Sequence, residues 1–508
     1  MSARTSFLPP DFFLPGPGKR KLSGPAEGVF DRLKRTKLVK NAPLETSKSS
    51  TYQNLQEDLS EKILDDRPQA DAEIPPIPLL YDGFGHFLDI MDGRNDAPGL
   101  ADVNVRELRD AVDDFAVKMT TFFNNDDDRR DEGIKCLNKI FAARRGTTII
   151  PPISAAAIGS VRSEGHNIAT HGPGTMGAKF KNSIAGISSL PAVELVGYVA
   201  RLDSRMDQQL YEGWRVPCLG LTIIGKLDIS AFNLHTNFLG CDITFYAIIP
   251  IDHRFRVISL TPTFSCIGSA SDGGDRSSLY SAFIASSVLQ ARIILDAKRF
   301  LTTPPAVIPT PARRFPAVTR LRKYFLSDEY FSFEIQSFFP ERLPNRLLYI
   351  AETPGPNKQR VVIKFARNYS IELHYFCARL GYAPPIFAFE RLPGGWCAVA
   401  MRYVESAVQI NHSPLLPTHK QIWKNQLQTL MNNFHEQNLV HGDLRGPNII
   451  CEGTSVMLLD FDWGGRLGEA CYPTWKLNDE LLAGRVDEDL RITKDDDRRV
   501  LSNTLNQL

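Results

Sequence analysis

The sequence has few features that would place the protein outside the cell or in a membrane. Its eight cysteines include no C-x-x-C pair and no metal-ligand spacing, which argues against a disulfide framework and a zinc site. No apolar run reaches the ~18 residues that a membrane span needs, and the N-terminus lacks the apolar core of a signal peptide. We therefore expect an intracellular protein with buried free thiols and no membrane partner.

An excess of charge of one sign is also lacking, since the formal net charge is +1 at pH 7. The exception is residues 1–50, which contain ten lysines and arginines in total but only four acidic residues. Because this segment is also rich in Pro, Ser and Gly, we expect residues 1–75 to be a basic disordered tail. Its clusters at 19–21 and 34–37 fit a nuclear-import signal or a nucleic-acid contact, and a solvated tail is an equal alternative. The protein is then expected in the nucleus or, without such a signal, in the cytoplasm.

The remaining composition is that of an ordinary globular protein, with 43% hydrophobic and 23% charged residues. Its length of 508 residues allows roughly three domains, each with its own core. Apolar residues recur at helical spacing over 104–144 and 278–300, and strand-like runs follow one another within 215–264. A Pro-rich stretch at 303–311 ends this region. We predict an α/β domain over 76–310.

Two polar motifs near the C-terminus carry most of the functional information. The sequence H-G-D-L-R-G-P-N spans 441–448, and D-F-D-W spans 460–463. Apolar runs between them predict a short strand pair, which would bring Asp460 beside Asn448. Because oxygen ligands from two loop segments can share a hard cation, this spacing predicts a divalent-metal site with Asp443 close to it.

Segments upstream fit one domain with these motifs. Lys364 ends an apolar strand, and a helix capped by Ser370 follows, with Glu372 in its first turn. A buried strand over 396–405 and an apolar stripe at helical spacing over 417–437 complete the pattern. A lysine at the end of a strand is usually a solvated residue, so Lys364 gains weight only from the segments around it.

These motifs resemble those of the protein-kinase-like fold. They are most similar to the fungal-type protein-kinase-like family, which is related to the kinase domains of crinkler-type effectors. The resemblance covers roughly residues 320–505, and its opening H-G-D is also similar to aminoglycoside and choline phosphotransferases. The motifs that carry it are V-V-I-K-F (361–365), L-P-G-G-W (392–396), H-G-D-L-R (441–445), D-F-D-W (460–463) and G-E-A-C-Y-P (468–473). It implies an α+β kinase-like domain over 311–508, with a small β-rich lobe and a short helical lobe.

The resemblance implies an ATP-dependent phosphotransferase that moves the γ-phosphate to a hydroxyl, with protein Ser/Thr as the favoured acceptor. Asp443 would accept or orient the hydroxyl. Arg445 would stabilise the transferred group, and Lys364 would neutralise the α- and β-phosphates.

The same resemblance implies the binding residues for ATP and Mg²⁺. Asn448 and Asp460 would ligate the Mg²⁺. Glu372 would pair with Lys364, although eight residues is a short separation for that pair. Met401 and Tyr403 lie where the strand over 396–405 enters the hinge that would meet adenine.

Some family features are absent. The turn at 339–345, where a glycine-rich loop should cover the phosphates, contains prolines and no glycine. Only 48 residues follow Asp460, fewer than a full activation segment and peptide-docking helices need. The sequence therefore favours an ATP site over a protein-substrate site. A nucleotide-sensing pseudokinase or scaffold is the second hypothesis, and a nuclear protein that associates with nucleic acid is the third.

In this family the region before the kinase domain resembles a restriction-endonuclease-like module. Its E-x-K signature best matches Glu194-Leu195-Val196, followed by Asp207. Such nucleases use acidic metal ligands and a lysine that orients water. Because Val196 replaces that lysine, we predict a degenerate nuclease-like domain over 76–310 that serves for folding or binding.

Other residues near the motifs are given smaller roles. Asp462 is either a further polar group beside the metal or a residue that only fixes the loop, and Trp463 is expected to pack. Residues 494–499 are predicted to begin a terminal helix capped by Thr493, with acids that suit a helix N-terminus.

Overall fold

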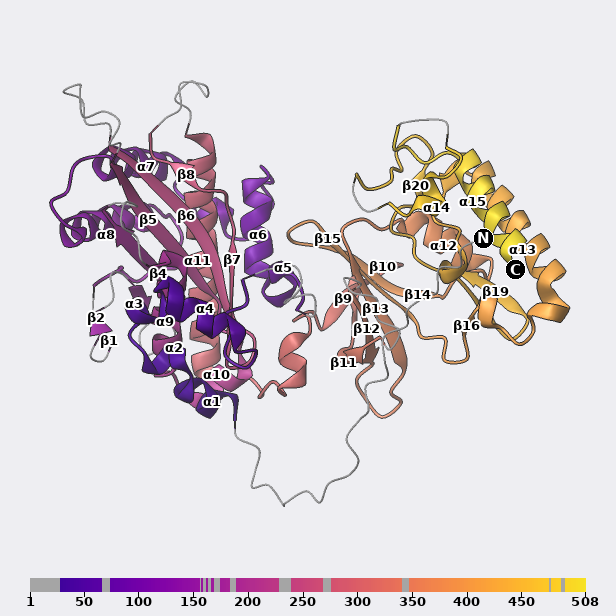
Figure 1. Ribbon diagram of the computed structural model, residues 1–508, viewed down its shortest axis with the longest axis horizontal. Helices are drawn as coiled ribbons and strands as arrows, with labels where there is room; N and C mark the ends of the chain where they lie inside the picture. Colours follow the sequence, from indigo (N-terminus) through magenta and orange to yellow (C-terminus); the bar gives the residue numbers. More distant parts are fainter. Residues whose placement is uncertain are drawn as a thin grey trace, which may run out of the picture.

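The computed structural model describes residues 28–65, 74–155, 174–182, 189–227, 239–267, 276–339, 347–474, 477–485 and 489–508, together with three short strands between 157 and 168. Two bodies lie side by side (Figure 1), and the chain passes from one to the other between the short 3-10 helix Pro311–Arg314 and strand β9 (Arg320–Lys323). We call residues 28–314 the N body and residues 315–508 the C body.

The N body is built on a six-stranded sheet in the order β3-β4-β5-β6-β7, with β8 beside β6. Strands β4 and β5 are parallel and are connected through helix α9, so they form a βαβ unit, whereas the other pairs are antiparallel. The bounds are β3 (His166–Ile168), β4 (Gly174–Lys181), β5 (Cys218–Leu227), β6 (Leu239–Pro250), β7 (Phe255–Ser259), β8 (Phe264–Ser265) and α9 (Pro191–Asp203).

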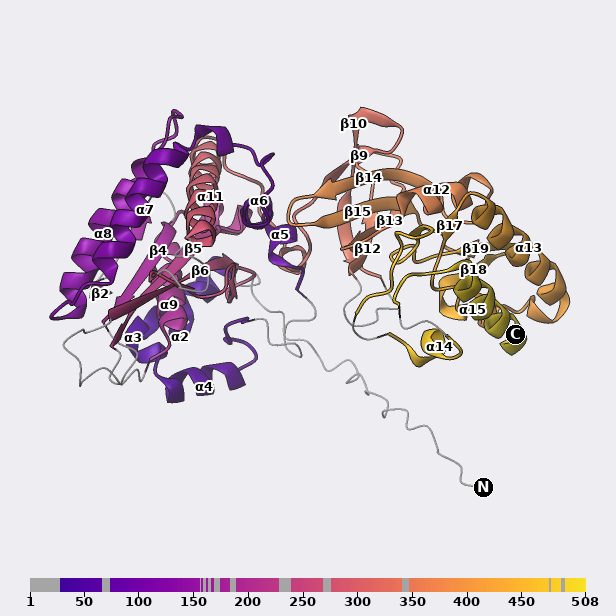
Figure 2. The same cartoon turned by 90° about the horizontal axis from the view of Figure 1, so that it is seen from above.

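Helices cover both faces of this sheet (Figure 2). Gly133 of α8 lies against the ring of Phe180 on one face of β4, and Gly177 lies against Leu195 of α9 on the other. The N body is thus the mixed α/β fold that the sequence predicts, while its likeness to a nuclease stays a prediction. The helices opposite α9 are α7 (Val105–Met119), α8 (Asp126–Ala142) and α11 (Ser277–Thr302).

In the described part of the chain, α11 is the one helix long and apolar enough to cross a bilayer by length and composition. Its most apolar 18-residue window has a mean hydropathy of 1.4, and 72% of that window is buried. Phe283 of α11 packs against Phe115 of α7 and Phe245 of β6, with ring centroids 5.5 and 5.2 Å apart. In this fold α11 therefore contributes to the core of the N body.

The expected disordered tail is wrong for residues 28–65. Four helices form here, the second and third of which pack against α9, and Leu33 and Leu38 are buried in the N-body core. Leu64 pairs with the edge strand β7, exchanging hydrogen bonds of 2.9 Å with Phe255 and Val257. The basic composition hid an apolar stripe at helical spacing, whose burial offsets the ordering cost. The helices are α1 (Val29–Arg35), α2 (Lys37–Lys40), α3 (Pro43–Thr46) and α4 (Ser49–Glu57).

Residues 1–27 and 66–73 lie outside the described residues, and with them the basic cluster at 19–21. The second cluster, 34–37, lies on α1 and α2, where Lys34 and Arg35 are exposed and Lys37 pairs with Asp58 at 3.1 Å.

The Pro-rich linker is part of the N body rather than a free connection. Arg313 is fully buried and donates to the carbonyls of Ile251 and Tyr211 at 2.9 and 3.2 Å. Arg215 in turn donates to the carbonyl of Phe315 at 2.9 Å. Within the Pro-rich stretch, Ile308 donates its N–H to the carbonyl of Glu212 at 2.9 Å. Packing on the N body therefore continues a few residues past the expected boundary at 310.

The C body has a seven-stranded sheet on one side and helices on the other (Figure 1). The expected strand pair between the two motifs is present, and a helix covers most of 417–437 as predicted. Phe333 separates β10 from β11 along the chain. The sheet order is β10 (Leu326–Ser332), β9 (Arg320–Lys323), β14 (Ile386–Leu392), β15 (Trp396–Arg402), β13 (Arg360–Ala366), β12 (Leu347–Glu352) and β11 (Glu334–Phe338). The helical part contains α12 (Ile371–Arg379), α13 (Leu416–Glu436), the hairpin β18 (Ile449–Glu452) and β19 (Ser455–Leu458), α14 (Asp479–Leu482) and α15 (Lys494–Gln507).

The two bodies meet where helix α6 (Asp82–Met91) of the N body contacts the turn between β14 and β15. Both carboxylate oxygens of Asp89 accept from the backbone N–H of Gly394 at 3.1 Å. Gly85 faces Pro393 so closely that a Cβ on Gly85 would lie 2.6 Å from it. Helix α6 therefore contacts the sheet lobe of the C body through a turn that leaves no space for a larger side chain.

Candidate functional site

A cavity of about 420 Å³ lies between the sheet and the helical part of the C body. Its size suits a small-molecule site. Five of the residues predicted from the sequence line it: Lys364, Met401, Tyr403, Asn448 and Asp460. Many of the other lining residues are apolar or aromatic and come from both parts of the C body, and Arg402, Glu405 and Gln409 add polar groups. The apolar and aromatic ones include Phe339, Leu348, Val362, Tyr369, Pro384, Ile450, Leu459 and Phe461.

Lys364 lies on the interior strand β13 and is buried. Its Nζ is 2.5 Å from Oδ1 of Asp460 and 2.5 Å from Oδ1 of Asp462. Burial alone would lower the pKa of this ammonium, but the two carboxylates outweigh burial and raise it. Lys364 is therefore a fixed positive charge on the wall of the cavity.

The expected pair of Glu372 with Lys364 is wrong. Glu372 forms an ion pair with Arg466 at 2.7 Å, and its side chain is 52% exposed. Ser370 caps α12 by accepting from Leu373 N, and Leu373 takes the buried face of the first turn. This orientation directs Glu372 toward solvent, and Asp462 stands beside Lys364 instead.

The loop over 441–448 brings three predicted residues together. Arg445 forms a two-point ion pair with Asp443, with Nε–Oδ1 at 2.5 Å and Nη2–Oδ2 at 2.9 Å. The hydrogen bond from Arg445 to Asp443 is the main reason why the pKa of the guanidinium is raised. Asn448 donates from Nδ2 to the backbone carbonyl of Asp443 at 3.0 Å. Asp443 and Arg445 are thus neighbours of the cavity-lining Asn448.

Asp497 holds this loop in place, a role that the sequence did not assign to it. It is fully buried on α15, and its carboxylate accepts from the backbone N–H groups of His441 and Gly442 at 2.8 and 2.7 Å. The predicted cap of α15 is present, with Thr493 and Asp496 forming a capping box. Helical periodicity was the available signal for its burial. Asp497 precedes the buried Val500 by three residues, which places both side chains on the same face of the helix.

Asp460 has a constrained backbone. Its φ of 64° makes it one of two non-glycine residues with positive φ in the part of the chain that the structure describes. For most side chains this conformation costs on the order of 1 kcal/mol, and aspartate tolerates it better than most residues. The conformation aims the carboxylate at Lys364. Local strain at a cavity is typical of functional sites.

A stack of rings supports the loop that carries Asp460. Phe461 lies between His374 and His441, with centroids 4.5 and 5.3 Å away. Tyr369 donates to Nδ1 of His374 at 2.7 Å, and Nε2 of His374 donates to the carbonyl of Pro384 at 2.8 Å. Burial lowers the pKa of His374 to about 4, so the imidazole is neutral near pH 7.

The donor set fits a hard divalent cation. Oδ1 of Asn448 is buried and has no hydrogen-bond partner among the described residues, and the carboxylate of Asp460 lines the same cavity. No group of three or more His, Cys, Asp or Glu residues that could hold a metal ion occurs in the described ranges. A cation here would therefore take further oxygens from a phosphate or from water, as Mg²⁺ does in nucleotide sites.

The turn predicted to cover the phosphates lies mostly outside the described residues, because only Phe339 of 339–345 is described. Phe339 extends β11 by donating its N–H to the carbonyl of Leu348 at 3.1 Å. Its ring lies 6.3 Å from that of Tyr403. Both aromatic residues line the cavity, Phe339 from the end of β11 and Tyr403 from the segment that follows β15.

The predicted nuclease residues do not form a comparable open site. Glu194 lies on helix α9 and pairs with Lys179 of β4 at 2.7 Å, and both side chains are buried. Val196 belongs to the hydrophobic core. Asp207 caps helix α10 (Gln208–Gly213) by accepting from Leu210 N at 3.0 Å. The lysine beside Glu194 thus comes from a strand and not from the E-x-K position.

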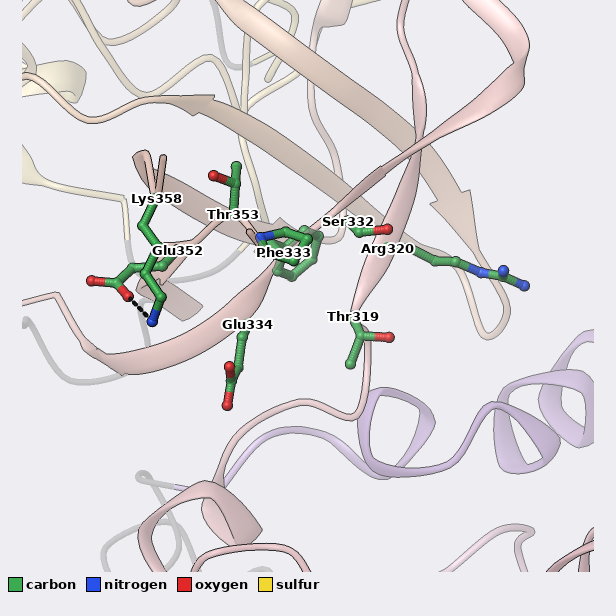
Figure 3. Close-up of a pocket in the computed structure, with 9 residues that line it drawn as sticks. Thr319, Arg320, Ser332, Phe333, Glu334, Glu352, Thr353 and Lys358 are labelled. Carbon is green, nitrogen blue, oxygen red and sulfur yellow. Dashed lines mark hydrogen bonds and ion pairs between the residues drawn. The ribbon is translucent and has the colours of Figure 1, made fainter. Parts of the chain in front are cut away.

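A second cavity, of about 230 Å³, lies at the edge of the C-body sheet (Figure 3). Glu352 and Lys358 on its rim form an ion pair at 3.2 Å. Its positive residues, Arg320 and Lys358, balance its negative ones, Glu334 and Glu352. None of the predicted functional residues lines it, and we assign it no role.

Among solved structures, the chain is similar to PK-1, a kinase of the Cydia pomonella granulovirus, and to vaccinia related kinase 3. The first has 14% identity and a TM-score of 0.27, covering 34% of this chain and 67% of that one. The second has 16% identity and a TM-score of 0.29, covering 42% of this chain and 72% of that one. At these TM-scores the similarity is too weak to assign a function. No protein-family model and no curated protein matches the chain, so the fungal-type and crinkler-related resemblance stays a prediction.

Proposed function

We propose that the C body is a kinase-like phosphotransferase that binds Mg-ATP in the 420 Å³ cavity and transfers the γ-phosphate to a hydroxyl. The observation that supports this most is the meeting of three separate segments at one cavity. Lys364 comes from a strand, Asn448 from the end of a loop, and Asp460 from the loop after the hairpin. A strand lysine, an amide oxygen and a carboxylate are the groups that phosphates and a hard cation require.

Each residue has a defined task in this mechanism. Lys364 binds the α- and β-phosphates, and Met401 and Tyr403 contact the base. Asn448 and Asp460 would hold Mg²⁺, which when bound would supply positive charge that neutralises the phosphate oxygens. Catalysis of this type depends on positioning and electrostatics more than on covalent chemistry.

Asp443 orients the acceptor hydroxyl and accepts its proton. Each of its oxygens accepts one hydrogen bond from Arg445 and keeps a second lone pair for the acceptor hydroxyl. The guanidinium beside Asp443 then stabilises the transferred phosphoryl group. We propose protein Ser/Thr as the acceptor class.

Substitution of Asp443 tests this function. In Asp443→Asn we expect transfer from γ-labelled ATP to a mixed panel of proteins and small hydroxyl compounds to fall about 10²- to 10⁴-fold, because the proton acceptor is lost. ATP binding should change little, since Asp443 does not line the cavity.

The matched control is Asp495→Asn, because Asp495 is an 88% exposed carboxylate on α15. It should behave like the wild type in both measurements. Full transfer by Asp443→Asn would falsify the assignment of this residue.

A nucleotide-sensing pseudokinase or scaffold is the second candidate. The engagement of both Asp443 oxygens by Arg445 supports it, because the guanidinium occupies one lone pair of each oxygen and so competes with an acceptor hydroxyl. In that case the wild type binds ATP, as calorimetry would detect, but transfers nothing to any acceptor in the panel.

We further propose an association with nucleic acid in the nucleus for the basic face of α1, where Lys34 and Arg35 are exposed. Removal of residues 1–50 is unsuitable as a test, because it would delete core residues such as Leu33. Salt-dependent DNA binding by the full chain, compared with Lys34→Glu, is the measurement that decides it.

A further inference from the structure

Lys364 has two carboxylate partners on one loop. Asp460 and Asp462 are two residues apart in D-F-D, and each places an Oδ1 2.5 Å from Nζ of Lys364. Phe461 between them is held in the stack of His374 and His441. The ring stack therefore fixes both carboxylates on the same side of the loop, toward β13.

The two carboxylates differ in what else they can bind. Asp460 lines the cavity with Asn448, whose buried Oδ1 has no partner among the described residues, so Asp460 belongs to the donor set for a cation. A carboxylate that turns toward a divalent cation weakens its pair with a lysine, since both compete for the same oxygens. Asp462 does not line the cavity and keeps its pair with Lys364.

Helix α12 offers no substitute. Glu372, the acid in its first turn, pairs with Arg466 at 2.7 Å, and both side chains are more than half exposed. Such an exposed pair adds little stability. It shows, however, that α12 presents the Glu372 side chain to solvent and not to Lys364.

We propose that Asp462, rather than an acid of helix α12, is the positioning residue that holds Lys364 against the phosphates. This inference rests on the proposed function, because it assigns Lys364 to phosphate binding. Lys364 and the cation-binding loop then form one unit, because Asp462, which holds the lysine, lies only two residues after Asp460. Displacement of α12 leaves that unit intact, so the position of Lys364 does not depend on the helix.

A direct readout is the reactivity of the Lys364 amine toward an amine-acylating reagent, measured by mass spectrometry on the folded, nucleotide-free chain. In Asp462→Asn we expect labelling at pH 8 to rise severalfold, because Nζ loses one of the two carboxylate contacts, each 2.5 Å long, that hold it in place. In Glu372→Gln labelling should stay within about twofold of the wild type, since its pair with Arg466 is exposed and screened.

A second readout separates positioning from binding. Asp462→Asn should lower kcat for phosphotransfer by about tenfold or more with a smaller change in KM for ATP, and Glu372→Gln should change neither. Asp462→Glu, which keeps the charge on a longer side chain, should restore slow labelling and part of the lost kcat. A thermal scan of each variant confirms that the labelled protein is folded.

The outcomes are distinct. If the wild type transfers no phosphate but Asp462→Asn still raises Lys364 labelling, the proposed function fails while the pair that carries this inference stands. The inference is overturned if Glu372→Gln raises labelling or lowers kcat while Asp462→Asn does neither.

Discussion

The two bodies each contain a lysine on a central strand paired with an acid, and only one of the pairs opens to a cavity. In the N body, Lys179 and Glu194 are 2.7 Å apart, and their side chains are 1% and 2% exposed. In the C body, Lys364 and Asp460 are 2.5 Å apart and 10% and 16% exposed. The second pair lines the 420 Å³ cavity and the first lines neither of the two cavities described above. A buried ion pair by itself therefore does not identify a functional site. An ion pair that opens to a cavity does.

The physical difference lies in what carries the acid. Glu194 is on helix α9, which lies flat on the sheet, and its neighbours Leu195 and Val196 are fully buried. Asp460 is on a loop between the sheet and the helical part, where a gap between two packed layers remains. The sealed pair is expected to matter for stability and the open pair for binding.

Loss of the sealed acid should have the largest effect on stability. In Glu194→Ala, Lys179 keeps its burial but loses its carboxylate, and we expect the free energy of unfolding of the N body to fall by about 3–5 kcal/mol. Urea denaturation followed by circular dichroism measures this. ATP binding by the protein that remains folded should be unchanged.

The control for Glu194→Ala is Glu45→Ala, which removes an exposed pair with Lys48 at 2.5 Å and should shift the urea midpoint little. If the two variants are equally stable, the sealed pair has no structural role and the comparison between the bodies fails.

Loss of Lys364, whose ion pair opens to the cavity, should weaken ATP binding. In Lys364→Met we expect ATP affinity, measured by calorimetry, to fall about 10- to 100-fold, because charge-assisted bonds to phosphate are lost. Stability should fall by less than in Glu194→Ala, because the carboxylates left without their lysine, Asp460 and Asp462, are 16% and 31% exposed and stay partly solvated.

Lys358→Met is a matched control, because Lys358 pairs with Glu352 on the same sheet but outside the 420 Å³ cavity. It should bind ATP like the wild type. Equal affinities of Lys364→Met and the wild type would remove Lys364 from the nucleotide site.

The ring stack beneath Lys364 should give the smallest effect, a dependence of stability on pH. The pKa of His374 is lowered by burial from 6.5 to about 4, so between these values the unfolded chain binds more protons than the folded one. The stabilisation that neutral His374 contributes to the folded state is fully present above about pH 6.5 and is lost as the pH falls toward 4. From pH 8 to pH 5.5 the loss is on the order of 1 kcal/mol.

Urea denaturation at the two pH values should therefore show a weaker pH dependence for His374→Leu than for the wild type. Part of the dependence will remain, because burial also lowers the pKa of His86 in the N body. An unchanged pH dependence would mean that His374 is not held neutral in the folded state.

Local patterns gave good predictions in the C body. The apolar runs between the two motifs predicted the hairpin of β18 and β19, and hence the meeting of Asn448 and Asp460 at one cavity. The cap at Thr493 was predicted in the same way. These features depend on residues close in sequence, whose geometry is set by turn and strand periods.

Predictions that needed long-range packing did worse. Composition suggested disorder for residues 28–65, but their apolar stripe is buried against helices more than a hundred residues away in sequence. The pair of Glu372 with Lys364 failed because the cap of α12 directs Glu372 outward. The role of Asp497 was missed because the backbone groups that it binds lie 55 and 56 residues away in sequence.

The sequence by itself determined the hairpin, the helix caps and the set of residues that can bind phosphate and a hard cation, because these follow from spacing and side-chain chemistry. Only the tertiary structure decided which acid stands beside Lys364, which acid holds the loop of Asp443, and which lysine pair opens to a cavity. These choices depend on the direction in which a packed helix or loop presents each side chain. That direction results from the burial of apolar neighbours far away in the chain.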